Sequence, residues 1–322
     1  MMLPRRDLLA SALALLCLEG CRDDVKAKPE QPSERLALRA DGTSPKKIRI
    51  GITPHAGEET AKELEPLLNY LRKQLPDTTF SADVAKGYDK LAGMLDNGEV
   101  EMGVFSPLSY VKHRKLLKAK AIELATVTKR GAPTYVGYLV IMRDEHAKDR
   151  PTLESLEGKR IAYVHKSSTS GYLYPRALLR SFGKDPDEFF APNPVFAGDH
   201  REALHKLWRG EVDVAAVASA FADPGPLNAL TSDEVDPKEV IAKLQVVAKT
   251  DRIPLDAVLL RNDIALETGM KLQRALLELH DDVSASRKLQ DAWGMNGFVS
   301  PKLADGTSRY DTIASVLKES GG

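Results

Sequence analysis

The sequence predicts an α/β protein of two lobes that are joined by a hinge of two crossing segments. From Lys46 onward, stretches with the alternation of a strand are followed by stretches with apolar residues at helical spacing, which is typical of a parallel α/β sheet. This rhythm stops at residues 121–143, where two strands follow one another, and it resumes at Arg160. This interruption indicates that the chain leaves the first lobe, forms a second lobe and returns to the first near residue 252.

The elements of the first lobe are predicted in chain order. Ile48–Ile52 alternates and ends before Pro54, so it is expected to be the first strand. Residues 57–74 carry leucines three and four positions apart, as one face of a helix does. The other elements expected here are strands at residues 80–84 and 100–105 and helices at 87–96 and from about 107.

Two strands in succession are expected at Ile122–Lys129 and Tyr135–Arg143, and the chain is expected to cross between the lobes near residues 140 and 252. We therefore assign residues 46–140 together with 253–322 to the first lobe, and residues 141–252 to the second. The elements expected after the first crossing are strands at residues 160–164, 195–196, 212–217 and 257–260, and helices at 170–182, 200–209, 264–280, 283–291 and 310–319.

Residues 1–20 have the pattern of a signal peptide. Arg5 and Arg6 form a positive n-region, and Leu8–Leu18 is an apolar stretch too short to span a bilayer as a permanent helix. Leu18-Glu19-Gly20-Cys21 then resembles the lipobox of bacterial lipoproteins, whose cysteine is lipidated and becomes the mature N-terminus, although Glu19 replaces the usual small or aliphatic residue. Plain cleavage or retention of the leader is the alternative.

Residues 21–45 are expected to be a flexible, lipid-anchored tether, because they are rich in charged residues, Pro and Ser. The protein would then sit in the periplasm of a bacterial cell envelope and touch the membrane only through its anchor. Arg5-Arg6-Asp7-Leu8-Leu9 is also similar to a twin-arginine export signal, so the export route stays open.

Composition excludes several classes of function. Lys and Arg together number 46, as do Asp and Glu, so no global field attracts nucleic acid. The two cysteines are Cys17 and Cys21, both in or next to the leader, so the mature fold has no disulfide and no thiol chemistry. The histidines have no metal-ligand spacing, so neither a metal nor another cofactor is expected.

A candidate anion site lies in the segment from Ile161 to Tyr172. A strand runs into Ser168-Thr169-Ser170-Gly171, which opens a helix. Three hydroxyls, the unpaired N–H groups of a helix N-terminus and a glycine that permits close approach suit a tetrahedral anion without a full positive charge. Taken alone, such a run is usually a simple helix N-cap.

Other short motifs accompany this turn in a fixed order: Ile50-Gly51-Ile52-Thr53-Pro54, Lys86-Gly87-Tyr88, Ser106-Pro107-Leu108-Ser109-Tyr110, Tyr135, Gly198-Asp199-His200, Gly210-Glu211-Val212-Asp213, Ile253-Pro254 and the C-terminal turn Gly297-Phe298-Val299. With them, residues 47–315 resemble the phosphonate-binding periplasmic proteins of ABC importers. Ser106 departs from the family's turn, which reads G-P-x-x-Y. The resemblance implies a type II periplasmic binding protein fold and a binding protein rather than an enzyme.

The resemblance also implies the ligand and its contacts. The ligand would be a small oxyanion such as a phosphonate, phosphate or phosphite, and the partner would be an ABC transporter permease. Because one tyrosine lies in the first lobe while the serine turn lies in the second, closure of the hinge would bring both sets of donors to one anion. The implied ligand-binding residues are Tyr88, Tyr135, Ser168, Thr169, Ser170 and His200.

Acidic residues bear on whether the ligand carries an amine. Relatives that bind aminoalkyl phosphonates hold the amine with carboxylates, and the candidates here are Asp223, Asp251 and Asp256. If these side chains do not point into the cleft, a ligand without an amine is favoured.

Two other functions compete with import. Ser170, His200 and Asp213 could be assembled into a hydrolase triad, but the sequence has no G-x-S-x-G elbow. A protein of the same fold could also present its anion to a membrane sensor. Ligand-dependent signalling in place of ligand-dependent transport would distinguish the sensor from the importer component.

The anchor hypothesis predicts the behaviour of a Cys21→Ala variant. Without the thiol no lipid can be attached, so the variant should leave the membrane fraction or fail to mature. Cell fractionation and mass spectrometry of the mature N-terminus measure this. A wild-type protein that is soluble and carries no lipid in its native host would contradict the anchor.

Overall fold

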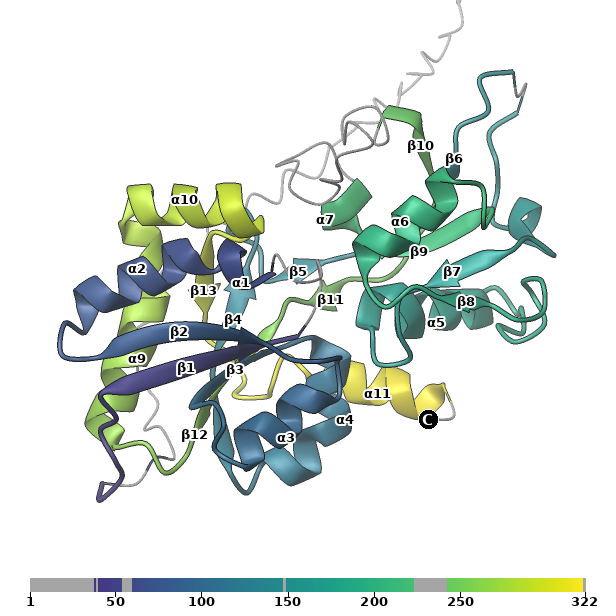
Figure 1. Cartoon of the computed structure of the whole chain (residues 1–322). Helices are drawn as coiled ribbons and strands as arrows, with labels where there is room; N and C mark the ends of the chain where they lie inside the picture. The colour runs from purple at the N-terminus through teal and green to yellow at the C-terminus, as the bar shows by residue number, and fades with distance from the viewer. Residues whose placement is uncertain (1–37, 39, 54–59, 147–148, 223–241, 321–322) are drawn as a thin grey trace, which may run out of the picture.

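Two mixed sheets form the centres of two lobes, as Figure 1 shows for the computed structural model, which describes residues 38, 40–53, 60–146, 149–222 and 242–320. The predicted α/β class with two lobes is confirmed. The six-stranded sheet has the order β13 (Gly297–Val299), β4 (Ala121–Thr128), β12 (Ala257–Arg261), β3 (Met102–Phe105), β1 (Lys47–Ile52) and β2 (Thr79–Val84). The five-stranded sheet has the order β10 (Leu244–Lys249), β6 (Gly137–Met142), β9 (Val214–Ala218), β7 (Ile161–Tyr163) and β8 (Val195–Phe196).

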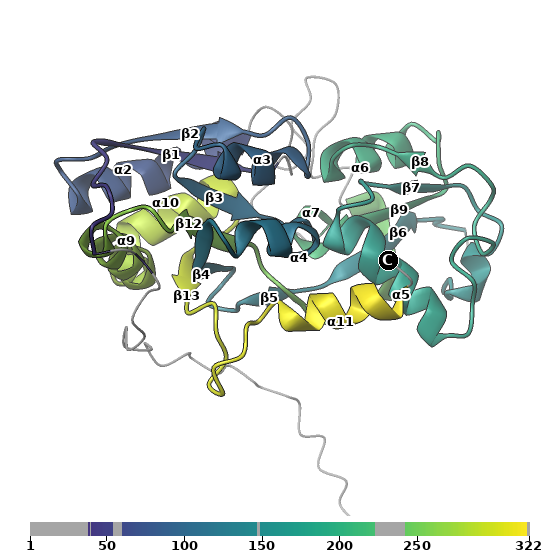
Figure 2. The ribbon, with the colours of Figure 1, turned by 90° about the horizontal axis from the view of Figure 1, so that it is seen from below.

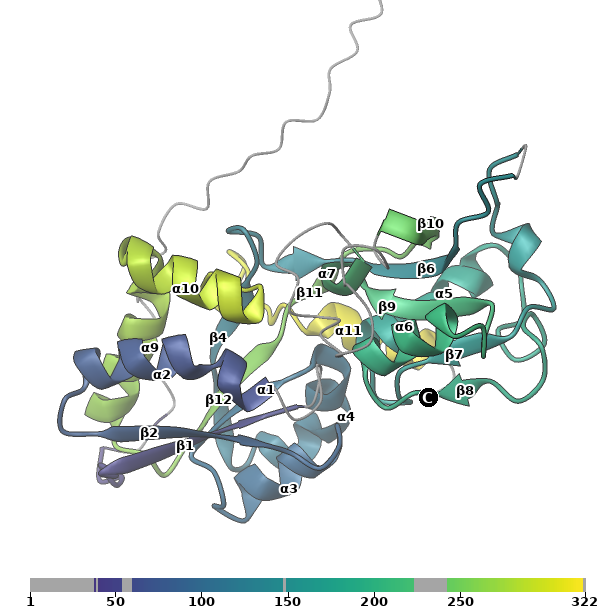
Figure 3. The same ribbon diagram turned by 45° about the horizontal axis from the view of Figure 1, so that its top comes forward.

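The first lobe buries both faces of its sheet. β1 pairs in parallel with β2 and β3, and β12 runs antiparallel between β3 and β4. Ile48, Ile50 and Ile52 are fully buried, which explains why β1 reads as an apolar strand. One face is covered by α2 (Glu65–Gln74), α9 (Leu266–Glu278) and α10 (Val283–Trp293), and the other by α3 (Lys90–Asp96) and α4 (Pro107–Leu117), as Figure 3 shows from another side.

The expected helix at residues 57–74 differs from the observed one. α1 (Thr60–Glu63) is a single turn, and α2 begins separately at Glu65 with Pro66 in its first turn. A proline fits the first turn of a helix but removes the N–H that a continuous helix would need there, so it favours a new start. Residues 54–59 lie outside the described residues.

The second lobe repeats the layered arrangement on a smaller scale. α6 (His200–Trp208) packs on one face of the five-stranded sheet through Leu204 and Leu207, and α5 (Tyr174–Ser181) packs on the other through Leu179. A short helix, α7 (Ser219–Ala222), follows β9 directly.

The chain passes between the sheets twice, at β5 (Thr134–Tyr135) and β11 (Ile253–Pro254), which pair antiparallel (Figure 1). β6 begins at Gly137 and pairs with the five-stranded sheet along its length, so the boundary expected at residue 140 falls inside a strand of the second sheet. Val136, the one residue between β5 and β6, is apolar like its neighbours. Tyr135–Arg143 therefore looks like one continuous strand in the sequence, and the change from one sheet to the other is not visible there.

The C-terminal part adds two features. Gly297–Val299, expected as a turn, is the edge strand β13 and pairs with β4. α11 (Asp311–Glu319) lies against both lobes (Figure 2): Ile313 shares a cluster with Leu108 of α4 and Tyr174 of α5, and Arg180 donates to the carbonyl of Ser320 at 3.2 Å. α11 therefore ties the lobes together beside β5 and β11.

The lobes are closed on each other. The backbone N–H of Leu108 in the first lobe donates to Oγ1 of Thr169 in the second at 2.9 Å, and Lys112 donates to Ser167 at 2.7 Å. Across the same gap Arg201 of α6 lies 4.0 Å from Glu63 of α1.

The expected signal peptide and Cys21 lie outside the described residues. Within residues 38–320, apart from the gaps named above, no helix combines the length and the apolarity needed to cross a bilayer.

Candidate functional site

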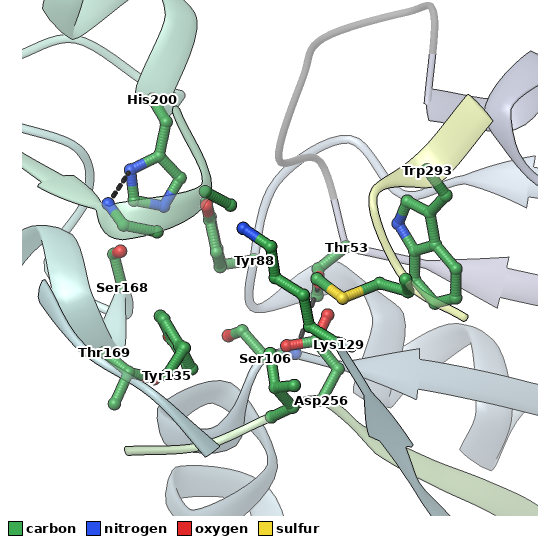
Figure 4. A pocket seen from close by; sticks show the side chains of 14 residues that line it. Thr53, Tyr88, Ser106, Lys129, Tyr135, Ser168, Thr169, His200, Asp256 and Trp293 are labelled. Carbon is green, nitrogen blue, oxygen red and sulfur yellow. Dashed lines mark hydrogen bonds between the residues drawn. The ribbon is translucent and has the colours of Figure 1, made fainter. Parts of the chain in front are cut away.

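A cavity of about 60 Å³ lies between the lobes, where the first turns of helices from both lobes meet (Figure 4). The first lobe and the hinge supply Thr53, Tyr88, Ser106, Lys129, Tyr135, Leu255, Asp256, Trp293 and Met295, and the second lobe supplies Ser168, Thr169, His200, Ala218 and Ala220. Five of the six ligand residues implied by the sequence line this cavity, and Ser170 does not.

Ser168 caps the helix and also faces the cavity. Its Oγ accepts the N–H of Gly171 at 3.1 Å, and residues 169–173 form one π-helical turn before α5. Gly171 is required, because a Cβ there would lie 2.4 Å from Cγ2 of Val164. The contact with the backbone fixes the Ser168 hydroxyl at the cavity, beside the phenol of Tyr88, where it can donate to a ligand.

Thr169 lines the cavity and also makes a hydrogen bond between the two lobes. Its Oγ1 accepts the N–H of Leu108, one of the N–H groups that α4 cannot satisfy internally. Such a bond contributes about 0.5–1.5 kcal/mol and forms only when the lobes are together. The Thr169 hydroxyl also lines the cavity, beside the phenol of Tyr135.

Ser170 is buried behind the hinge tyrosine. The Tyr135 phenol lies 3.3 Å from Oγ of Ser170, to which it donates. Burial first, and then the negative charge of Asp256, raises the pKa of Tyr135 above its ordinary value, so the phenol stays protonated. Ser170 thus positions a residue of the cavity wall rather than forming part of that wall.

Tyr88 crosses from the first lobe into the second. Its ring is 3% exposed, belongs to the apolar cluster around α6, and stacks on His165 with ring centroids 5.4 Å apart. Burial chiefly, with a contribution from Asp256, raises the pKa of Tyr88 well above its ordinary value. The phenol is therefore a neutral O–H group at the cavity, and the ring holds the lobes together.

His200 is fixed as a hydrogen-bond donor. It is the first residue of α6, and its Nδ1 accepts the N–H of Ala218 at 3.2 Å, the bond dashed in Figure 4. With Nδ1 as an acceptor, the ring proton sits on Nε2. His200 thus presents an N–H group to the cavity while its ring stays neutral.

Sequence reasoning missed two polar groups in the first-lobe wall. Oγ of Ser106, the residue noted as a departure from the family's turn, points into the cavity and is buried without a hydrogen-bond partner among the described residues. Lys129 extends from the end of β4 across the cavity (Figure 4). The site therefore has a full positive charge, contrary to the expectation from the serine turn alone.

The three acidic candidates separate. Asp256 lines the cavity, whereas Asp251 is exposed and does not line it. Asp223 lies outside the described residues.

The alternative hydrolase triad is not formed. Asp213 is held by a bidentate contact with Arg160, and Nδ1 of His200 faces a backbone N–H instead of a carboxylate. In the described part of the chain no group of three or more His, Cys, Asp or Glu side chains could hold a metal ion.

Comparison with known proteins agrees with this geometry. The family described as "ABC transporter, phosphonate, periplasmic substrate-binding protein" matches residues 50–305. The phosphate-import protein PhnD of Mycolicibacterium smegmatis is 28% identical over 224 residues, which span 67% of this chain and 66% of that protein's own length.

Solved structures share the fold. PhnD1 of Prochlorococcus marinus in complex with methylphosphonate superposes with a TM-score of 0.71 at 16% identity, covering 86% of this chain and 99% of that one. The alkanesulfonate-binding protein SsuA of Xanthomonas axonopodis pv. citri, bound to MOPS, gives a TM-score of 0.58 at 15% identity, covering 86% and 94%. At such identities the likeness concerns the fold, and it confirms the predicted type II arrangement of two lobes.

The wall positions predict an order of effects on binding of methylphosphonate, measured by calorimetry. Ser168→Ala and Thr169→Ala should each cost roughly 1–3 kcal/mol, because each removes a donor to a charged ligand. Ser170→Ala should cost less, since Ser170 acts through Tyr135. Thr169→Ser, which keeps the hydroxyl, is the matched control, and thermal unfolding separates loss of binding from loss of the Ser168 cap. Equal affinity in Ser168→Ala, Thr169→Ala and wild type would refute the assignment.

Proposed function

We propose that this chain, which belongs to the phosphonate-binding family of periplasmic substrate-binding proteins of ABC transporters, holds a small phosphorus oxyanion between its lobes and delivers it to an importer. The family is one of binding proteins and not of enzymes. The observation that carries the proposal is the cavity between the lobes, which both lobes line with polar side chains.

The size of the cavity supports a small ligand. About 60 Å³ is room for roughly four to six water-sized groups, and phosphate, phosphite and methylphosphonate have four or five heavy atoms. The relatives agree in chemistry: one is named for phosphate import and one was solved with methylphosphonate. A long substituent would require the lobes to stay further apart.

The donors suit a tetrahedral anion. We propose that Tyr88, Tyr135, Ser168, Thr169 and His200 bind its oxygens, and that Tyr135 donates to the anion in exchange for its hydrogen bond to Ser170. The hydroxyls of Ser168 and Thr169 and Nδ1 of His200 accept backbone N–H groups, which orients the two hydroxyls and places the ring proton of His200 on Nε2. A site of donors fixed before the ligand arrives needs little reorganisation to bind it.

A ligand without an amine is favoured. Asp256 lines the cavity and could accept from an ammonium group, but Lys129 lines the same wall. The charges of Lys129 and Asp256 oppose each other for an ammonium group and for an oxyanion alike, but the neutral donors of the wall favour the oxyanion alone.

The envelope location completes the proposal. Residues 1–20 would be removed as a signal peptide, Cys21 would carry the lipid, and residues 21–45 would be the tether that holds the lobes near the permease. Delivery to a permease embedded in the same membrane requires such proximity, and the tether supplies it without fixing the orientation of the lobes.

Calorimetry with purified protein tests the function. We expect saturable binding of one anion per chain for at least one of methylphosphonate, phosphate and phosphite, and weaker binding of 2-aminoethylphosphonate because of its size and its amine. Deletion of the gene should reduce uptake of the bound anion by the native host. Absence of binding to all three small anions would overturn the proposal.

Solution scattering tests the mechanism. A ligand that gains contacts in the closed form must shift the lobes toward it, so the radius of gyration should fall when methylphosphonate is added. Tyr88→Ala should weaken this compaction, because it removes the ring that packs into the second lobe. Tyr88→Phe keeps the ring and should retain the compaction at lower affinity. A scattering profile that does not change at saturating ligand would leave a rigid binder.

A further inference from the structure

The charged side chains of the cavity wall are few. Among the described residues that line the cavity, Lys129 is the one basic side chain with a permanent charge and Asp256 is the one acidic side chain. The other polar groups are neutral hydroxyls, neutral phenols and the imidazole of His200, whose Nδ1 is an acceptor. Lys112, the nearest lysine of α4 to the lobe interface, donates to Ser167 and does not line the cavity.

The backbone holds Lys129 firmly at this place. Lys129 and Ala132 exchange two backbone hydrogen bonds, of 2.9 and 3.0 Å, around a tight turn. Arg130 and Gly131, with φ of 51° and 77°, give that turn the geometry typical of a two-residue hairpin. The N–H of Gly131 also donates to Oδ1 of Asn296 at 3.2 Å, which ties the turn to the segment after α10.

We propose that Lys129 determines the ionic charge that the site selects, by favouring doubly charged phosphorus oxyanions over singly charged tetrahedral anions of the same shape. This inference rests on the proposed function and specifies the charge of its ligand.

Coulomb's law gives the reason. Every group of the wall interacts about twice as strongly with a dianion as with a monoanion, but a full charge contributes more energy than a neutral hydroxyl, phenol or imidazole N–H group, so Lys129 contributes a large share of the difference between the two anions. Asp256 repels an anion by the same law, and its repulsion also doubles. Lys129 offsets this repulsion, so removing Lys129 leaves a site that disfavours the dianion most.

Methylphosphonate and methanesulfonate form a suitable pair of probes. They have nearly the same shape, and in mildly alkaline buffer the first carries two negative charges and the second carries one. The measured quantity is the ratio of their dissociation constants, determined by calorimetry in wild type and in variants of Lys129.

The wild type should prefer methylphosphonate by at least about tenfold. Lys129→Met keeps the length of the side chain without its charge and should reduce this preference by about tenfold, mostly through weaker methylphosphonate binding. Lys129→Arg should keep most of the preference. Lys271→Met removes an exposed lysine of α9, paired with Glu267 outside the site, and is the control for net charge.

The possible outcomes distinguish failure of this inference from failure of the proposed function. If Lys129→Met keeps the wild-type ratio, or weakens both anions equally, Lys129 does not select charge and the inference fails. Thermal unfolding checks that the variant is folded, and Lys129→Gln serves as a second neutral variant if Lys129→Met is not. A wild type that binds none of the phosphorus oxyanions would overturn the proposed function itself.

Discussion

The site depends on one constraint: backbone N–H groups donate to three of the side chains that face the cavity and so fix their orientation. Ser168 accepts from Gly171, Thr169 from Leu108, and His200 from Ala218. Each of the three keeps a proton that it can donate, so these donors are oriented before any ligand arrives. Neutral donors held by the main chain favour an anion without the desolvation cost of several buried cations.

The same contacts couple binding to the shape of the molecule. Thr169 takes its backbone partner from the other lobe, and Tyr88 places a ring from the first lobe in the apolar cluster of the second. Neither arrangement exists when the lobes are apart. The geometry that receives the anion and the geometry of the closed lobes are therefore one state, which is the condition for a ligand to shift the population of conformers.

Features formed by residues that are close together in the sequence could be predicted from it. The strand, turn and helix around Ser168-Thr169-Ser170-Gly171 could be recognised because all their parts are neighbours in the sequence, and the periodicity of the helices and strands predicted both lobes.

The place of Lys129 in the cavity wall could not be predicted from the sequence. Its direction is set by a tight turn and by the hydrogen bond of that turn to Asn296, far along the chain. Asp251 and Asp256 look alike in sequence, but they lie on opposite sides of β11, and the folded chain leaves Asp251 exposed before it and places Asp256 at the cavity after it. Ser170 was expected in the wall, but the π-helical turn places it behind Tyr135.

α11 constrains how the lobes can move. Two extended segments such as β5 and β11 would by themselves permit both bending and twisting of one lobe against the other. α11 packs on α4 in the first lobe and on Tyr174 and Arg180 in the second, beside the paired segments, and this third connection resists rotation of one lobe against the other about the long axis of the molecule. Opening therefore has one dominant rotational degree of freedom, and the two sets of donors return to the same relative orientation each time the lobes close.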